Sequence, residues 1–188
     1  MLKRLQLLFN KVLHEGVSPK SWKNAIVTLI FKKGDKAKLS NYRPISILDH
    51  TYKLFTKLVT IRLTQRLDHS QPVEQAGFRT DFSTIDHIFT VRQLTEKCIE
   101  YNRPLCMVFI DFEKAFDSLE HWAVLQSLER SQVDDRYIQI IKEIYSGATL
   151  QVKLHELTNP IKIHRGVRQG DTISPKLFSS ALEDVFRL

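Results

Sequence analysis

The chain reads MVFIDFEKAFD from Met107 to Asp117. A short apolar run there ends on the carboxylate of Asp111, and a second carboxylate follows at Asp117. Apolar runs of about four to eight residues bounded by polar ones are typical of buried strands, so we predict a strand over residues 105–111. An aspartate at the carboxyl end of such a strand lies where open α/β sheets bind ligands, and its oxygens suit Mg²⁺. The alternative is a buried strand that simply ends in a polar residue.

Three other segments carry short patterns of their own. Residues 41–48 read NYRPISIL, residues 74–79 read EQAGFR, and residues 165–175 read RGVRQGDTISP. Together with residues 107–117, and in this order, they resemble the motifs of reverse transcriptases. The resemblance is closest to enzymes of non-LTR retrotransposons, particularly the RTE-like kind. In that family the first segment is the fingers motif, the second lies between fingers and palm, and the last two are motifs A and B.

The expected fold follows from periodicity and from this resemblance. Periodicity by itself predicts an α+β protein and no more. The resemblance implies the right hand of polymerases, with a fingers-like region in residues 1–104 and a partial palm in residues 105–188. We expect mixed helices and a small, mostly antiparallel sheet.

The family's motif C, thumb and N-terminal endonuclease do not occur in the sequence, which ends at Leu188. Two-metal catalysis needs more than one carboxylate, so we expect these 188 residues alone not to polymerise DNA at a meaningful rate. Without the hairpin that presents motif C, we also expect the strand over residues 105–111 to expose an apolar edge, which favours aggregation.

Apolar residues recur at helical spacing in six places. The predicted helices cover residues 2–14, 51–67, 83–101, 122–130, 134–145 and 175 to the chain end. The second helix carries the apolar residues Leu54, Phe55, Leu58, Ile61 and Leu63. The third has a predicted core face made of Ile85, Ile88, Phe89, Val91 and Leu94. Ser83 or Thr84 is a predicted N-cap, as is Ser174, with Pro175 in the first turn.

Strands are predicted from apolar and β-branched runs. Residues 25–31 form one strand, and residues 149–154 and 161–164 pair as a hairpin. Pro44 lies in an extended segment.

The resemblance assigns roles to the residues of motif A. Asp111 is the expected catalytic residue and metal ligand, and the backbone carbonyl of Phe112 is expected to complete part of one coordination shell of Mg²⁺ or Mn²⁺. Phe116 matches the steric gate, a bulky ring that clashes with a 2′-hydroxyl and so selects deoxynucleotides; by itself it could equally be a core phenylalanine. Asp117 has a glutamate three residues later, at Glu120, which favours a helix-capping box over a metal ligand.

Nucleotide-binding and template-binding residues follow from the same comparison. The resemblance implies that six residues contact the incoming nucleotide: Lys32, Arg43, Phe112, Phe116, Gln169 and Gly170. Lysine and arginine suit a triphosphate, and glycine permits close approach. It also implies that the template path is lined by Gln75, Phe78 and Arg79. Arg165 and Arg168 either supply charge near phosphates or belong to a solvated turn.

Charge is distributed unevenly along the chain. Of the 28 Lys and Arg residues, 14 lie in residues 1–66 beside only three acids, a balance of +11, whereas the remainder has a balance of −4. Such asymmetry indicates a polyanionic partner, although a solvated basic face is the alternative. No apolar run approaches the roughly 20 residues of a membrane span, and the N-terminus does not have the form of a secretory signal, so we expect a cytoplasmic and possibly nuclear location.

These observations lead to one function and one alternative. The resemblance implies an RNA-directed DNA polymerase, which transfers dNMP to a primer 3′-OH by two-metal catalysis, with an RNA template, a DNA primer and dNTPs as partners. We expect this chain to be a catalytically incomplete fragment of such an enzyme. The alternative is a nucleic-acid-binding protein without catalysis, which uses the basic residues of the fingers-like region.

Overall fold

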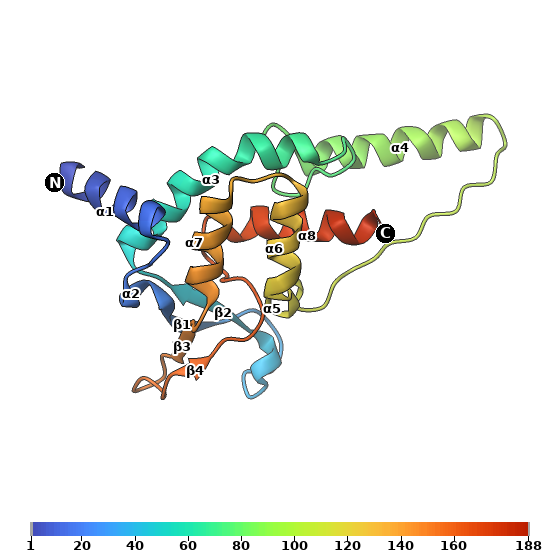
Figure 1. Ribbon diagram of the computed structural model, residues 1–188. Coiled ribbons are helices and arrows are strands. Elements are labelled where there is room, and N and C mark those ends of the chain that lie inside the picture. Colours follow the sequence, from blue (N-terminus) through green and yellow to red (C-terminus); the bar gives the residue numbers. More distant parts are fainter. Residues whose placement is uncertain (1, 188) are drawn as a thin grey trace.

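The computed structural model describes residues 2–187 (Figure 1). Its elements in chain order are α1 (Leu2–Glu15), α2 (Lys20–Lys23), β1 (Asn24–Phe31), the 3₁₀ helix η1 (Leu39–Asn41), β2 (Tyr42–Ile47), α3 (His50–Ser70), α4 (Thr84–Glu100), α5 (Ala115–Ser118), α6 (His121–Arg130), α7 (Asp135–Tyr145), β3 (Thr149–Val152), β4 (Ile161–Lys162) and α8 (Ser174–Phe186). All six predicted helices are present, with bounds within a few residues of those expected.

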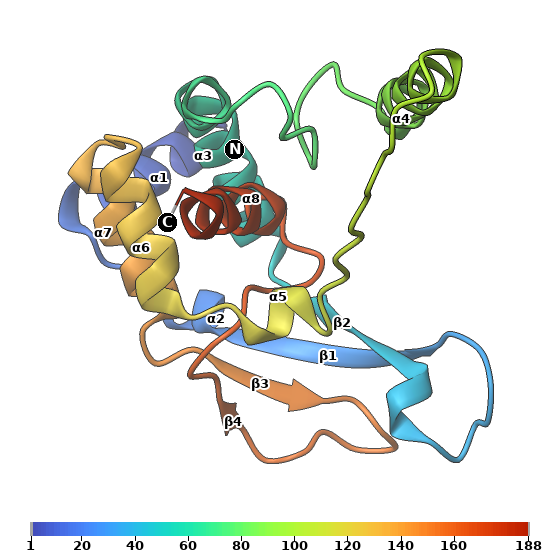
Figure 2. The ribbon, with the colours of Figure 1, turned by 90° about the vertical axis from the view of Figure 1, so that its right-hand side faces the viewer.

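The sheet has the strand order β2-β1-β3-β4. Strand β1 pairs antiparallel with β2, and β3 pairs antiparallel with β4, as the predicted hairpin requires. The β1–β3 pair is parallel, so the sheet is mixed. Figure 2 shows most of the helices gathered on one side of this sheet. Accordingly Ala25 and Val27, which alternate with outward residues along β1, are buried.

An aromatic cluster forms the centre of the core. Phe9 of α1, Trp22 of α2, and Tyr52 and Phe55 of α3 lie with neighbouring ring centroids 5.1–6.3 Å apart, in tilted and edge-on arrangements. Offset and edge-on contacts of this kind stabilise beyond the area they bury. The cluster joins the N-terminal helices to α3, whose N-cap Asp49 accepts hydrogen bonds from the first-turn amides.

The apolar residues that α3 was predicted to carry do not all lie on its buried face. Phe55 and Leu63 are buried, but Leu54, Leu58 and Ile61 are exposed. The buried stripe instead runs through Tyr52, Thr56, Val59 and Leu67. With about 3.6 residues per turn, the exposed Leu54, Leu58 and Ile61 lie on the opposite side of the helix from this stripe. The polar Thr56 within the buried stripe concealed it from a hydrophobicity pattern.

Helix α4 forms as predicted, but its apolar face is not in the core. Ser83 caps it in a capping box with Asp86, which confirms the predicted start. The predicted core residues Ile85, Ile88, Phe89, Val91 and Leu94 are all exposed. The helix projects away from the other helices (Figures 1 and 2), so its amphipathic face contacts no second layer among residues 2–187.

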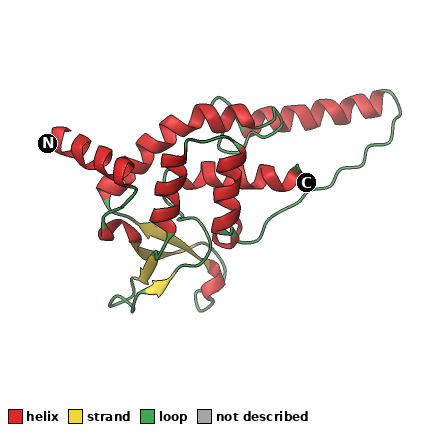
Figure 3. Cartoon of the chain, viewed as in Figure 1, coloured by secondary structure: helices red, strands yellow, loops and turns green. Residues whose placement is uncertain are grey.

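The predicted buried strand over residues 105–111 is wrong for this structure. The segment is a long irregular connection between α4 and α5 (Figure 3). Val108, Phe109 and Ile110 are 68–86% exposed. A strand requires hydrogen-bonded neighbours, and no strand within residues 2–187 lies along this segment. The apolar exposure that was expected for one edge therefore extends over the whole segment.

Candidate nucleotide-binding site

A loop of residues 165–172, which we call the motif B loop, joins three parts of the fold. The backbone N–H of Gly166 donates to the Leu119 carbonyl at 2.7 Å, and the N–H of Val167 donates to the Phe116 carbonyl at 2.8 Å. On the other side, the N–H of Ser46 in β2 donates to the Gln169 carbonyl at 3.0 Å. Motif A, motif B and the fingers motif are thus brought together by backbone hydrogen bonds.

Two glycines make this approach possible. Gly166 has φ +90°, and a Cβ atom there would lie 2.8 Å from the Asp117 carbonyl oxygen. Gly170 has φ +102°, and a Cβ atom would lie 3.2 Å from the Ser46 carbonyl oxygen. Both positions therefore need the conformational freedom and the small size of glycine.

An open cavity of about 410 Å³ lies against this junction. Four residues predicted to bind the nucleotide line it: Arg43, Phe116, Gln169 and Gly170. They come from β2, α5 and the motif B loop. The rest of the wall is formed by neighbouring residues of the same segments and by the start of α8: Ile45, Lys114, Ala115, Arg168, Asp171, Ser174 and Pro175. Cavities of roughly 300–1,000 Å³ are the usual size for small-molecule ligands, so the volume suits a nucleotide.

Phe116 lies at the edge of the cavity and is held by two other rings. Its ring stacks on Phe178 of α8 at 4.9 Å between centroids, with 16° between the planes. Phe78 meets it edge-on at 5.9 Å. The ring is half-buried and contacts the core while its remaining surface faces the cavity. The structural and functional interpretations of Phe116 are therefore compatible.

The template candidates lie in the connection between α3 and α4. Phe78, with φ +57°, is 55% exposed, and its ring lies edge-on to Phe116. Arg79 donates to the Pro72 carbonyl at 2.8 Å, and its guanidinium lies over the Phe82 ring. The Gln75 side chain accepts from the Gly77 N–H. These residues shape the connection and place Phe78 next to the cavity.

Lys32, Asp111 and Phe112 do not line the cavity. Lys32 follows β1, where its N–H donates to the Asn41 carbonyl, and its side chain is exposed. Asp111 and Phe112 are exposed in the irregular connection. Among residues 2–187, no three His, Cys, Asp or Glu side chains gather as possible metal ligands. One carboxylate and one backbone carbonyl do not make a two-metal centre, so the described residues do not by themselves fit the expected ions.

Asp117 is not a helix cap, which corrects the prediction. Helix α6 begins at His121 with Glu120 at its N-cap, and α5 ends at Ser118. The Asp117 carboxylate instead accepts a hydrogen bond from the Gln169 amide nitrogen at 2.8 Å. This contact spans 52 residues, so helix-start patterns could not reveal it. It orients the Gln169 side chain beside the cavity.

Ser174 is also not the N-cap of the last helix. The N-cap is Ile173, and Ser174 is the first helical residue, with Pro175 in the first turn as predicted. The observed start differs from the predicted one by one residue, which is within the usual variation of helix boundaries.

Arg168 and Asp171 are buried; the sequence left two interpretations open for Arg168 and assigned no role to Asp171. Arg168 is only 4% exposed, which excludes a solvated turn, and its guanidinium donates to the Trp22 carbonyl at 2.8 Å. Asp171 is also 4% exposed, and it accepts hydrogen bonds from the hydroxyls of Tyr52 and Thr56. Burial raises the pKa of Asp171, although these hydrogen bonds oppose the shift. Burial and the Asp171 charge raise the pKa of Tyr52 well above its usual value.

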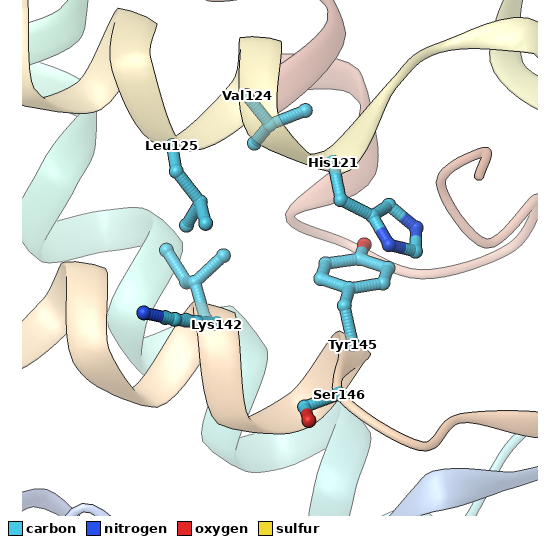
Figure 4. A pocket seen from close by; sticks show the side chains of 7 residues that line it. His121, Val124, Leu125, Lys142, Tyr145 and Ser146 are labelled. Carbon is cyan, nitrogen blue, oxygen red and sulfur yellow. The ribbon is translucent and has the colours of Figure 1, made fainter. Parts of the chain in front are cut away.

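A second, smaller cavity of about 160 Å³ lies between α6 and α7 (Figure 4). Its lining is mainly apolar, with His121 beside Tyr145 at 4.9 Å between ring centroids. His121 Nε2 lies 2.9 Å from the Gly166 carbonyl oxygen, so this side chain supports the motif B loop from α6. None of the predicted site residues lines this cavity.

The arrangement is that of the polymerase right hand. It is similar to the solved structure of apo telomerase from Candida tropicalis truncated from its C-terminal domain, with a TM-score of 0.59 and 18% identity. The match covers 95% of this chain and 43% of the telomerase chain. At this identity the likeness concerns the fold, and it confirms the predicted class.

The sequence comparisons define the family. The chain belongs to the reverse transcriptase (RNA-dependent DNA polymerase) family, whose profile matches residues 30–188. It is 32% identical over 180 residues to an uncharacterised 149 kDa protein of transposon TX1 from Xenopus laevis, with 93% of this chain and 14% of that protein covered. It is 30% identical over 188 residues to the RNA-directed DNA polymerase of the mobile element jockey from Drosophila melanogaster, with 98% and 20% covered.

A third relative is the Pol polyprotein of the type-1 retrotransposable element R2 from Popillia japonica. It is 29% identical over 172 residues, with 90% of this chain and 24% of the relative covered. All three relatives are named for transposons or other mobile elements, which agrees with the predicted resemblance to retrotransposon reverse transcriptases. The chain spans only 14–24% of the length of these three relatives. The RTE-like subtype stays a prediction.

No helix among residues 2–187 combines the length and the apolar character needed to cross a membrane.

Proposed function

We propose that this chain forms the nucleotide-binding part of an RNA-directed DNA polymerase. Such an enzyme would add dNMP to the 3′-OH of a DNA primer paired with an RNA template. The observation that carries the proposal is the cavity, because Arg43, Phe116 and the Gln169–Gly170 pair meet there from three separate segments. Their wide separation along the sequence argues against a chance meeting of these four residues.

Each lining residue has a chemical role in this proposal. The guanidinium of Arg43 pairs with the triphosphate or stacks on the base, and Lys32 adds charge from the end of β1. The ring of Phe116, supported by Phe178, blocks the space that a 2′-hydroxyl would need. Gln169 bonds the sugar or the template backbone, and Gly170 allows the ligand to approach the chain closely.

Asp111 and the Phe112 carbonyl are the proposed ligands for Mg²⁺ or Mn²⁺ in a complete enzyme. Oxygen donors of these kinds suit such ions, which would supply charge neutralisation at the transferred phosphate. Since the described residues do not complete the ligand set, we expect the 188-residue chain to bind nucleotide without extending a primer.

The remaining assignments concern the template and the layout of the chain. Residues 1–104 are the proposed fingers-like region and residues 105–188 the partial palm. Gln75, Phe78 and Arg79 are the proposed template contacts, since the exposed Phe78 ring can stack on a base beside the cavity. The proposed place of action is the cytoplasm or the nucleus.

Photo-crosslinking of a radiolabelled dNTP with a photoreactive base to the full chain tests the proposal. We expect the crosslink to map to the cavity and to weaken in Arg43→Ala. Arg62→Ala is the matched control, because Arg62 is exposed on α3 and contacts Tyr137 away from the cavity. Phe116→Ala should admit the ribonucleotide that the natural chain rejects. A crosslink that is absent or independent of Arg43 would refute the proposal.

Nucleic-acid binding without nucleotide binding is the second candidate function. The basic balance of residues 1–66 favours it, because phosphate contacts give sequence-independent affinity. An RNA that binds in a salt-dependent manner, together with no dNTP crosslink, would select this candidate over the polymerase.

A further inference from the structure

The motif B loop is held by two buried charged side chains that flank its cavity-lining residues. Arg168 and Asp171 are each 4% exposed, and Gln169 and Gly170 lie between them. All four residues contribute to the wall of the nucleotide cavity, but the charged groups of Arg168 and Asp171 are bonded to partners inside the protein. The conformation of Gln169 and Gly170 thus depends on how Arg168 and Asp171 are attached.

Both terminal nitrogens of Arg168 donate to carbonyls inside the protein, whereas its buried Nε has no hydrogen-bond partner among the described residues. One terminal nitrogen donates to the Trp22 carbonyl at 2.8 Å, and the other donates to the Lys23 carbonyl at 3.3 Å. The guanidinium plane also lies over the rings of Tyr52 and Tyr145, at 5.1 and 5.9 Å. The planar guanidinium of Arg168 contacts two carbonyls and two aromatic rings. A lysine, which carries a point charge, cannot reproduce these contacts.

Asp171 is attached to α3. Its carboxylate accepts from the Tyr52 hydroxyl and, at 2.8 Å, from the Thr56 hydroxyl. The Thr56 oxygen also lies 3.1 Å from the hydroxyl of Thr172, the last residue of the loop. A buried carboxylate needs such donors, because an unpaired one would be costly.

We propose that Arg168 and Asp171 are positioning residues for the nucleotide cavity, and that Tyr52 and Thr56 of α3 act through them. They hold the loop in the conformation that presents Gln169 and Gly170 to the ligand. This inference rests on the proposed function, since it concerns the same cavity. It adds that α3 residues, which do not line the cavity, control nucleotide affinity.

Thr56 provides the sharpest test, because truncating Asp171 or Arg168 could unfold the chain. Thr56→Val keeps the side-chain shape but removes the hydroxyl, and Thr56→Ser restores it. Thr60→Val is the matched control: Thr60 lies one turn later on α3, and its hydroxyl donates only to the Thr56 carbonyl. Tyr52→Phe, with Tyr137→Phe as its control, removes the second donor in the same way.

Two measurements apply to each full-length variant. Hydrogen–deuterium exchange over residues 166–171 reports loop opening, and dNTP crosslinking as a function of concentration reports affinity. We expect Thr56→Val and Tyr52→Phe to accelerate exchange and to weaken dNTP binding about tenfold, because affinity falls with the fraction of competent loop. Thr56→Ser and both controls should behave like the natural chain.

Arg168→Lys separates positioning from direct phosphate contact. If Arg168 positions the loop, the lysine variant also shows faster exchange and weaker binding, even though the charge is kept. Unchanged exchange in Thr56→Val, or faster exchange with unchanged affinity, would overturn this inference and leave the proposed function intact. A natural chain that does not crosslink dNTP would overturn the proposed function itself, and the inference with it.

Discussion

Replacing Gly166 with alanine should destabilise the protein far more than the same change at Gly147. Both glycines have positive φ, +90° and +68°. A Cβ atom at Gly147 meets no atom within 4 Å, so that variant reports backbone strain alone. A Cβ atom at Gly166 would lie 2.8 Å from the Asp117 carbonyl oxygen, which is closer than real contacts allow.

The expected free energies follow from these contacts. Positive φ in alanine costs about 1–3 kcal/mol, and about 0.4–1 kcal/mol is recovered because the unfolded chain becomes stiffer. We therefore expect Gly147→Ala to lose about 1 kcal/mol. At Gly166 the loop must also move, which weakens the Gly166–Leu119 and Val167–Phe116 hydrogen bonds at about 1 kcal/mol each. The total there is about 3 kcal/mol.

Urea denaturation followed by tryptophan fluorescence measures both variants, since Trp22 is buried and reports unfolding. For a chain of this size, about 3 kcal/mol corresponds to a Tm lower by roughly 6–12 °C. Equal losses in the two variants would show that the contact between the motif B loop and Asp117 does not constrain the fold. That result would refute the argument for the junction.

Three other substitutions or titrations test separate features. Lys176→Met should lose about 3 kcal/mol in urea denaturation, because it leaves the largely buried carboxylate of Asp68 without its partner; a loss below about 1 kcal/mol would contradict the buried pair. Hydrogen bonds from Arg136 lower the pKa of Asp134 to about 2, so NMR titration should show its midpoint well below 3.8. The stabilisation from this cap is present above the usual pKa and disappears as the pH falls from about 4 towards 2, and Arg136→Ala should return the midpoint towards normal. Phe109→Lys should change stability by less than about 0.5 kcal/mol and reduce sedimentable aggregate, since the ring is 81% exposed; a large loss of stability would show that Phe109 is packed in solution.

Local patterns in the sequence determined the helices and much of the candidate site. The capping box at Ser83 needs only neighbouring residues, and it forms as predicted. The motif segments also marked Arg43, Phe116 and the Gln169–Gly170 pair, which do meet at one cavity. These predictions succeeded because a helix start or a short motif depends on residues a few positions apart.

Only the tertiary structure decided what each pattern packs against. The apolar face of α4 and the run at residues 105–111 have the composition of a core, yet both are exposed. An apolar segment becomes buried only where another part of the protein packs against it. Conversely, Arg168 and Asp171 have the composition of a solvated turn, yet they are buried. Their partners are Trp22, Tyr52 and Thr56, more than 110 residues earlier in the chain. Contacts over such distances depend on how the helices pack, which local periodicity does not encode.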